Sequence, residues 1–451
     1  MIKNDVFTLD ITDVTSEGFG IGHYGGMAVF VPFTAVGDKA KVTAVKVKPN
    51  YAYGKMLEIL SPSEDRTEVD CPYFYRCGGC AFRHISYKSE LEIKLRRVDE
   101  TLRRIGGAEI RCGGIVGANT PDGYRNKAQF PFSENAQAGF FAPRSHRVIP
   151  IKNCALLPEV LNGISECVSA FCKEYSIPVY SEKTHTGLLR HLYIREGAVS
   201  GEIMAVLVIN DNTLPSAEKL VCRLKALLGD RLKSLQININ KKDTNVILGD
   251  ENKVIYGEPY INDTLCGVKV RLSPFTFYQV NHGMAEKLYE KAAEYAAPED
   301  KSVIDLYCGA GTIGLSMAKK AKRVTGVEIV PEAVEDARRN AEACGIKNAN
   351  FICGDAASAA IELHRRGETA DVVILDPPRK GCDSALLETV ANGFSPEKIV
   401  YVSCDPATLA RDIKILSSLG YNAEEYTVFD MFPRTAHCEA VCKLLRSDIN
   451  S

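Results

Sequence analysis

The chain has 451 residues, of which 45% are hydrophobic, and its formal net charge is −2. That length suits about three domains of ordinary size, and the hydrophobic fraction is typical of a globular protein with a buried core. The small net charge excludes a global basic field of the kind that attracts nucleic acids, although a local basic groove would be enough to bind RNA.

Sixteen cysteines are scattered along the chain, which is too long to be a small disulfide scaffold. The first residues lack the apolar core of a signal peptide, and no apolar run approaches the ~18 residues of a membrane span. We therefore expect a cytoplasmic, monomeric protein without a membrane partner. Most of its cysteines should be buried as small hydrophobic residues.

Residues 1–62 predict a small β-barrel. Strand-like runs at 6–11 and 28–32 are separated by glycine-rich turns. Residues 39–48 alternate charged and apolar side chains, so one face of that strand would be basic. Such a barrel suits RNA binding, and an ordinary solvated strand face would explain the same lysines.

Residues 63–274 predict a mixed central region. A helix is expected over 88–104, and the apolar run at 204–209 indicates a buried strand. Its basic residues include Lys94, Arg96, Arg97, Arg103 and Arg104.

The same region contains a cluster of cysteines, Cys71, Cys77 and Cys80. Two glycines between the last two would let the backbone wrap around an ion or a cluster. A fourth ligand must come from elsewhere, and Cys154 is the best candidate. Ligation by four cysteines fits a structural zinc or an iron–sulfur cluster, and the spacing does not choose between them. Three unligated cysteines so close together would be unusual.

Residues 275–451 alternate strands and helices, the pattern of a doubly wound parallel α/β sheet. A helix over 331–343 begins with proline, which favours a first helical position. Strands are predicted at 303–306, 323–327, 350–352, 372–375, 399–402, 426–429 and 439–444.

A glycine-rich loop at 305–314 follows the first of these strands and opens a helix, which suits a ligand held close to the backbone. The loop begins with an acidic residue and lacks the regular glycine spacing of a pyrophosphate site. Glu328 ends the second strand, where a carboxylate accepts from two ribose hydroxyls. These features favour S-adenosylmethionine (AdoMet) over a dinucleotide. Asp355 follows the third strand and would meet the adenine edge or cap the helix at 356–363.

Asp376 ends the fourth strand, and the two prolines after it fix the backbone so that its carboxylate points into the cleft. Amino-methyltransferases that act on bases have a similar sequence motif that ends in an aromatic residue. Here Arg379 and Lys380 follow instead, which counts against methylation of adenine N6.

Cys404 ends the fifth strand, directly before a predicted helix at 407–416 whose dipole would favour a thiolate. Uracil C5 is too weakly nucleophilic to take a methyl group directly. A thiolate that adds to C6 makes C5 enolate-like, so that it can attack the methyl donor. The alternative for Cys404 is a buried cysteine at a strand end.

Release of such an adduct requires a base that removes the C5 proton, and Glu439 is the candidate. We expect it where the chain turns at the sheet edge, a position that also suits a solvated carboxylate. His437 is a rival base, although a structural or RNA-contacting role suits it better.

Together these residues resemble the RNA 5-methyluridine methyltransferases over essentially the whole chain. Segments 403–412 and 437–439 are similar to the family's nucleophile and base signatures, which implies catalysis by Cys404 and Glu439. Segment 273–281 resembles the entry to the catalytic domain and implies that Gln279 lies beside AdoMet. Segment 124–129 is similar to a signature near the RNA groove, so Arg125 and Lys127 are candidates for RNA contact. The resemblance further implies that Tyr307, Glu328 and Asp376 contact AdoMet. It also implies a [4Fe-4S] cluster bound by Cys71, Cys77, Cys80 and Cys154.

Thr312 departs from the family pattern, because some members have asparagine there, and we assign it no donor contact. The resemblance implies three domains, which are a TRAM-like RNA-binding barrel at 1–62, a central α+β domain with the cluster and RNA groove at 63–274, and an AdoMet-dependent methyltransferase domain with a Rossmann-like sheet at 275–451.

The implied function is AdoMet-dependent formation of 5-methyluridine in 23S rRNA, as part of rRNA processing. The alternatives are the same reaction on the tRNA T-loop, 5-methylcytidine formation by the same covalent logic, and a non-catalytic RNA-binding or assembly factor. The usual proline-cysteine phrase of the cytidine enzymes is absent, since the fourth strand ends at Asp376.

Overall fold

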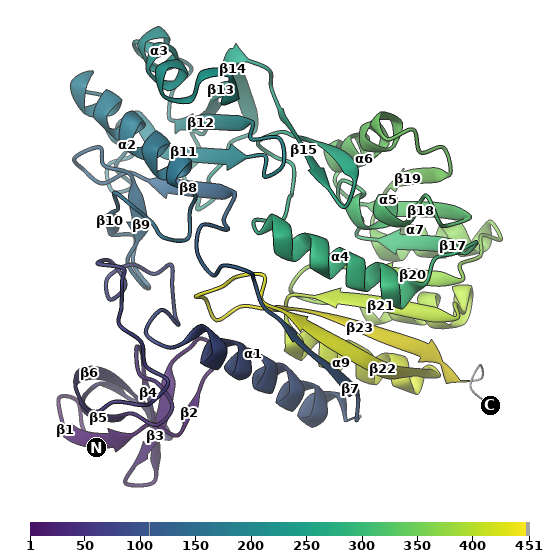
Figure 1. Ribbon diagram of the computed structural model, residues 1–451, viewed down its shortest axis with the longest axis horizontal. Helices are drawn as coiled ribbons and strands as arrows, with labels where there is room; N and C mark the ends of the chain where they lie inside the picture. Colours follow the sequence, from purple (N-terminus) through teal and green to yellow (C-terminus); the bar gives the residue numbers. More distant parts are fainter. Residues whose placement is uncertain (108, 448–451) are drawn as a thin grey trace.

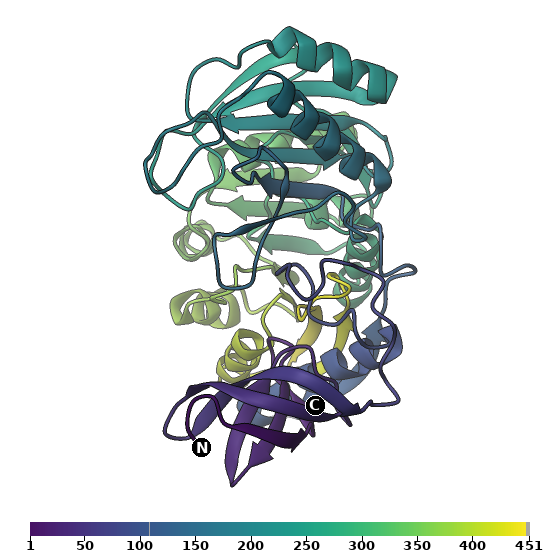
Figure 2. The same ribbon diagram turned by 90° about the vertical axis from the view of Figure 1, so that its left-hand side faces the viewer.

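A computed structural model describes residues 1–107 and 109–447. Residue 108 and residues 448–451, which fall within the predicted central and C-terminal domains, lie outside the described residues. Figure 1 shows an N-terminal sheet, a central sheet with two helices on one side, and a larger C-terminal sheet flanked by helices. In Figure 2 the N-terminal sheet lies at one end of the molecule and the central sheet at the other.

The N-terminal sheet has six strands in the order β1-β5-β6-β4-β3-β2. In β5 the side chains of Ala40, Val42 and Ala44 are buried. Lys39 and Lys41, which directly precede Ala40 and Val42, are exposed, which confirms the predicted alternation. The strands are β1 (Val6–Asp10), β2 (Asp13–Val14), β3 (Gly20–Tyr24), β4 (Met27–Val31), β5 (Lys39–Val47) and β6 (Tyr51–Ser61).

The central region contains a five-stranded sheet in the order β14-β13-β12-β11-β8. All seven residues of β12 are buried, which confirms the strand predicted at 204–209. The sheet strands are β8 (Lys127–Pro131), β11 (Leu189–Glu196), β12 (Ile203–Ile209), β13 (Leu232–Ile239) and β14 (Glu251–Gly257). Two hairpins, β9 (Gly139–Phe141) with β10 (Val148–Pro150) and β15 (Ile261–Leu265) with β16 (Val268–Leu272), complete its strands.

The predicted helix at 88–104 is confirmed as α1 (Tyr87–Thr101), which continues as a π-helical turn over Leu102–Gly106. Among the basic residues of this helix, Lys94 has a fully buried side chain that takes part in an ion-pair network. The other helices of the region are α2 (Glu159–Glu174), α3 (Ala217–Leu228) and the 3-10 turn Gly229–Arg231.

The C-terminal sheet has eight strands in the order β19-β18-β17-β20-β21-β23-β22-β7, and β23 alone runs antiparallel to the others within this described sheet. All seven predicted strands are confirmed. They are β17 (Ser302–Leu306), β18 (Arg323–Glu328), β19 (Ala349–Cys353), β20 (Val372–Leu375), β21 (Lys398–Ser403), β22 (Tyr421–Phe429) and β23 (Glu439–Arg446).

The eighth strand, β7 (Arg111–Val116), was not predicted. It comes from the central part of the sequence and pairs in parallel with β22 at the sheet edge. It is continuous in the chain with α1, which runs beside it in Figure 1. The C-terminal sheet is therefore completed by a segment that precedes its other seven strands in the sequence, with the whole central sheet in between.

Helices cover both faces of this sheet, as the strand–helix alternation predicts. The predicted helix 331–343 is confirmed residue for residue as α6 (Pro331–Ala343). The others are α4 (His282–Ala296), α5 (Thr312–Met317), α7 (Ala356–Arg365), α8 (Ser384–Glu388) with the π-helical Thr389–Phe394, and α9 (Pro406–Ser418). Among residues 1–107 and 109–447, no helix is long and apolar enough to cross a membrane.

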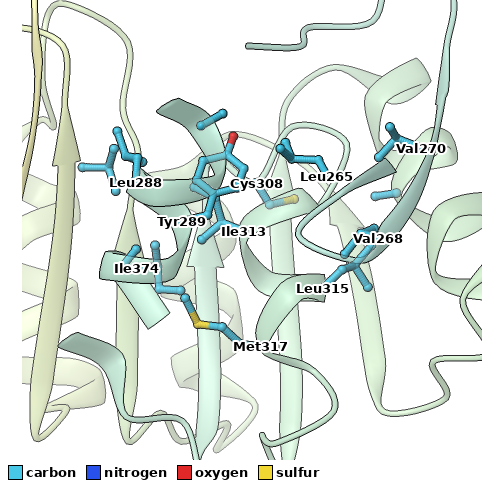
Figure 3. Close-up of a cluster of buried hydrophobic side chains, with 14 of the residues drawn as sticks. Leu265, Val268, Val270, Leu288, Tyr289, Cys308, Ile313, Leu315, Met317 and Ile374 are labelled. Carbon is cyan, nitrogen blue, oxygen red and sulfur yellow. The ribbon is translucent and has the colours of Figure 1, made fainter. Parts of the chain in front are cut away.

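The apolar core beneath α4 and α5 reaches the edge of the sheet where the parallel strands end. Figure 3 shows Tyr289 of α4 side by side with Cys308 and Ile313 within this cluster of buried side chains. The same three residues line the largest cavity described below. The core thus forms one wall of that cavity and fixes its shape by packing.

Candidate active site

A cavity of about 840 Å³ lies at the carboxyl ends of β17, β18, β20 and β21. This edge is where open α/β sheets bind ligands, because the parallel strands all end there. The seven residues predicted for catalysis and donor binding come from separate parts of the sequence and all line this cavity. They are Gln279, Tyr307, Glu328, Asp355, Asp376, Cys404 and Glu439.

The glycine-rich loop is ordered by Glu328. One carboxylate oxygen of Glu328 accepts from the Gly309 backbone N–H at 3.0 Å, and the other accepts from Val330 N–H at 2.9 Å. Tyr307, at the start of the loop, has a φ of +68°. A tyrosine in this left-handed region is strained, and such strain gathers at ligand sites.

Carboxylates crowd the cavity and its floor. Burial and the neighbouring Asp376 carboxylate raise the pKa of Asp305 to about 8, and one oxygen of this fully buried side chain has no hydrogen-bond partner. Burial raises the pKa of Asp376 to about 7. Burial and Asp376 likewise raise the pKa of Glu439 to about 8, against the opposing effect of Arg379. A cavity with this many carboxylates suits a cationic ligand.

Cys404 follows β21 and directly precedes Asp405, which caps α9 by accepting from Ala407 and Thr408 N–H. The helix start is therefore where the sequence predicts it. Burial, Glu439 and Asp376 together raise the pKa of Cys404 to about 11. Arg379 is the neighbouring cation that acts in the opposite direction.

The loop after Asp376 is pinned to α9. Arg411 donates to the backbone carbonyls of Lys380 and Cys382, and the buried Asp412 accepts from Cys382 N–H at 2.8 Å. Gly381 between them has a φ of +73°, and a β-carbon there would lie 2.5 Å from the Arg411 guanidinium. The site therefore requires glycine at 381, and the Asp376 and Cys404 segments are held together.

The segment carrying Gln279 is anchored by two buried residues of the central region. Arg195 donates to the carbonyls of Ser273 and Thr276 at 3.0 and 2.8 Å. The Asn126 side chain donates to the carbonyl of Gln279 at 3.0 Å. These bonds join the central sheet to the cavity and fix Gln279 at its rim.

Asp355 is the N-cap of α7, since it accepts from Ser358 N–H at 3.1 Å, and it also lines the cavity. The two expectations for this residue are thus compatible. His437 lines the cavity from an exposed position near Phe432. Burial and the cations Arg379, Arg97 and Lys94 lower its pKa, so the ring is neutral at physiological pH.

Sequence analysis missed several cavity residues. Tyr289 and Phe432 gave no signal, because the first lies within an apolar helix face and the second in an irregular loop. Phe277 lines the cavity with 67% of its surface exposed, which marks an aromatic ring at the mouth. Thr312, to which no donor contact was assigned, also faces the cavity. Lys127, expected near RNA, lies in its wall, and burial with Arg195 and Arg125 lowers its pKa to about 8.

A second cavity, of about 240 Å³, is lined by the four predicted ligands Cys71, Cys77, Cys80 and Cys154. Burial raises the pKa of Cys80 to about 12 and that of Cys154 to about 11. Across residues 1–107 and 109–447, no three or more histidine, cysteine or carboxylate side chains lie close enough to hold a single metal ion. The four cysteines line one shared cavity.

Close backbone packing shapes this second cavity. Gly78 donates to the carbonyl of Phe141 at 3.0 Å, and a β-carbon at Gly78 would lie 3.1 Å from that oxygen. The loop between Cys77 and Cys80 is thereby pressed against β9. Lys127 lines both cavities.

Comparison with known families matches residues 86–447 to the family described as tRNA (Uracil-5-)-methyltransferase and residues 3–57 to the TRAM domain. An uncharacterized RNA methyltransferase of Halalkalibacterium halodurans is 43% identical over 447 residues, which cover 98% of this chain and 97% of that protein. An uncharacterized RNA methyltransferase of Clostridium tetani is 42% identical over 443 residues, covering 97% and 96%.

Among solved structures, the Pyrococcus abyssi tRNA (uracil-54, C5)-methyltransferase in complex with S-adenosyl-L-homocysteine is similar along nearly its whole length. The TM-score is 0.80 at 28% sequence identity, and the match covers 97% of this chain and 100% of that one. The agreement extends over the N-terminal, central and C-terminal sheets alike.

Proposed function

The chain belongs to the tRNA (uracil-5-)-methyltransferase family and is an AdoMet-dependent RNA methyltransferase with an N-terminal TRAM domain, and from this we propose that it forms 5-methyluridine through a covalent bond between Cys404 and uracil. The observation that supports the proposal is that Cys404, Glu439 and the residues predicted to contact AdoMet all line one cavity. A target uridine must leave its stack to enter such a cleft. The exposed ring of Phe277 at the mouth suits stacking on an RNA base.

In the proposed reaction the Cys404 thiolate forms a bond to C6, and the electrons of the C5=C6 double bond make C5 nucleophilic. C5 then takes the methyl group from the sulfonium, which leaves as a neutral thioether. Glu439 accepts the C5 proton, the C5=C6 bond re-forms and the C6–S bond breaks, which returns the thiolate. Asp376 and Gln279 hold the base and the donor in line.

The carboxylates support a cationic methyl donor. AdoMet carries a positive sulfonium, which favours the ionised forms of Asp305, Asp376 and Glu439 and so lowers their raised pKa values. Ionised Glu439 is the form that can accept the C5 proton. Binding of the donor therefore prepares the base, and loss of the sulfonium charge after transfer favours protonation of Glu439.

We expect AdoMet binding to release protons and to tighten as the pH rises from 6 towards 8. The free carboxyls of Asp376 and Asp305, with pKa values of about 7 and 8, are partly protonated in that range, and the bound cation removes those protons. The Kd should fall by up to about tenfold per pH unit for each coupled carboxyl. Calorimetry in buffers of different ionisation enthalpy measures the release.

S-adenosylhomocysteine is the matched control, because it differs by the methyl group and the sulfonium charge. It should release fewer protons on the same protein. Equal proton release by the two ligands would contradict the electrostatic role of the carboxylates.

For the second cavity we propose a [4Fe-4S] cluster held by Cys71, Cys77, Cys80 and Cys154. Four thiolates are the usual ligands of such a cluster. All four cysteines line one cavity, as a cluster with four thiolate ligands requires. When bound, the cluster would supply a rigid cross-link between the 71–80 loop and Cys154. Methyl transfer moves no net electrons, so a structural or RNA-contacting role follows.

After anaerobic reconstitution the protein should contain about four irons and four acid-labile sulfides per chain. Cys80→Ser should lose most of both and melt at a lower temperature, because a ligand and its cross-link are removed. Cys222→Ser, on the exposed face of α3, is the control and should retain them. One zinc per chain without sulfide would contradict the proposal.

For the RNA target we propose 23S rRNA, which rests on the family resemblance of the TRAM-like barrel and the four cysteines. The tRNA T-loop is the second candidate, supported by the full-length similarity to an enzyme described as a tRNA (uracil-54, C5)-methyltransferase. Both candidates use the same cavity chemistry.

Nucleoside mass spectrometry of separated 23S rRNA and tRNA, from cells with and without the gene, tests the whole proposal. Loss of 5-methyluridine from 23S fragments supports the first target and locates the site. Loss from tRNA alone moves the target to the T-loop. Unchanged 5-methyluridine in both RNAs, with AdoMet binding intact, would favour a non-catalytic RNA-binding factor.

A further inference from the structure

The loop 430–438 connects β22 to β23 and ends at Glu439, the first residue of β23. Phe432 and His437 of this loop line the cavity beside Glu439. In Figure 1 the loop extends from the ends of β22 and β23 towards the junction of the three sheets. It has no regular secondary structure, so other contacts must fix its shape.

The backbone carbonyls of the loop are bound by groups from other segments. Asn281 donates to Met431 O at 3.2 Å, and Tyr124 donates to Pro433 O at 3.1 Å. The N–H groups of residues 81 and 82, next to Cys80, both donate to the carbonyl of residue 434. Hydrogen bonds from several other segments of the chain thus fix the backbone of the loop.

At the centre of these contacts is a network that is entirely buried. The Lys94 ammonium donates to the carboxylates of Glu90 at 2.7 Å and Asp430 at 2.6 Å, and to the carbonyl of Phe432 at 3.2 Å. All three charged side chains have no exposed surface. Lys94 and Glu90 belong to α1, and Asp430 opens the loop.

Two further bonds extend the network. The Tyr87 hydroxyl donates to the second oxygen of Asp430 at 2.7 Å, and Glu90 accepts from the backbone N–H of Arg434 at 2.7 Å. The network therefore contacts the loop at positions 430, 432 and 434. A buried ion network is seldom worth more in stability than apolar packing, but its directional bonds fix one loop geometry.

We infer that the network of Tyr87, Glu90, Lys94 and Asp430 positions the loop 430–438 so that Glu439 removes the C5 proton. None of the four lines the cavity, so they are positioning residues that act through the loop. The inference rests on the proposed function, because it assigns the proton-removal step to Glu439. It predicts that disturbing the network slows this step more than methyl transfer.

The test uses RNA with tritium at uridine C5 and AdoMet with a radiolabelled methyl group under single-turnover conditions. Tritium release reports proton removal, and label in RNA reports methyl transfer. In the triple variant Glu90→Gln, Lys94→Met, Asp430→Asn, which removes the three fully buried charges together, tritium release should lag methyl transfer by about tenfold or more. Tyr87→Phe removes one hydroxyl and should show a smaller lag.

Lys88→Met is the matched control, since Lys88 lies on the same helix with its side chain 85% exposed. In this variant the rates of tritium release and methyl transfer should remain equal, as in the wild type. Melting temperature separates the roles, because a purely stabilising network would lower it in the variants without separating the two rates. Equal rates in both the triple variant and Tyr87→Phe would overturn the inference.

Glu439→Gln on the same RNA distinguishes this result from a failure of the proposed function. If Glu439→Gln stalls as a covalent adduct while the network variants keep their two rates equal, only the inference is wrong. If Glu439→Gln releases tritium normally, the base assignment is wrong and the inference is wrong with it.

Discussion

Cys404→Ala should abolish methyl transfer to RNA, with a loss of more than about 10⁴-fold in single-turnover rate. Without the Cys404 thiolate, no bond forms to C6, and uracil C5 does not become nucleophilic enough to take the methyl group. AdoMet affinity should change by less than about threefold, because the carboxylates and Gln279 remain. The measurement is transfer of labelled methyl to RNA beside calorimetry with AdoMet.

Cys222→Ala is the matched control for this experiment. Cys222 is exposed on α3 and is not among the residues that line the cavity. It should keep most of the activity. A Cys404→Ala protein that still methylates at a near-native rate would refute the covalent scheme and leave direct transfer as the alternative.

Glu439→Gln should trap the enzyme on its substrate. The glutamine amide cannot accept the C5 proton, so methyl transfer occurs once and the Cys404–C6 bond persists. Turnover should fall by about 10²- to 10⁴-fold, while a protein–RNA adduct that resists denaturation accumulates. Denaturing gel electrophoresis with labelled RNA detects the adduct, and labelled methyl in the same band shows that transfer preceded the stall.

His437→Gln provides the comparison, because His437 is the rival base in the same cavity. It should turn over without accumulating the adduct. Adduct with His437→Gln and none with Glu439→Gln would exchange the two assignments.

The wild-type rate of proton removal should also rise between about pH 7 and 9, since the raised pKa of Glu439, about 8, keeps much of this base protonated at neutral pH.

The strands and helices that set up the cavity could be predicted because their signals are local. The helix α6 begins at Pro331, and Asp405 with Pro406 marks the start of α9, so a cap and a proline define each boundary. Cys404 and Asp376 lie at the ends of apolar strands that neighbour one another in a doubly wound sheet. Their meeting in one cavity follows from that topology.

What the sequence did not reveal depends on partners far along the chain. Lys94 looks like any basic residue of an amphipathic helix, and its burial depends on Asp430, which lies 336 positions away. The strand β7 contains two glycines and becomes a strand only by pairing with β22. The raised pKa of Cys404 likewise comes from burial and from the carboxylates of Glu439 and Asp376, which belong to other parts of the sheet edge.

The pairing of β7 with β22 also bears on how the protein is made. Arg111 of β7 and Glu425 of β22 form an ion pair across 314 positions of sequence. During translation β7 leaves the ribosome long before its neighbour exists, so the sheet edge closes only when nearly the whole chain has been synthesised. Until then β7 and α1 have nothing from the C-terminal sheet to pack against. The pairing of β7 at the sheet edge must therefore await the synthesis of β22.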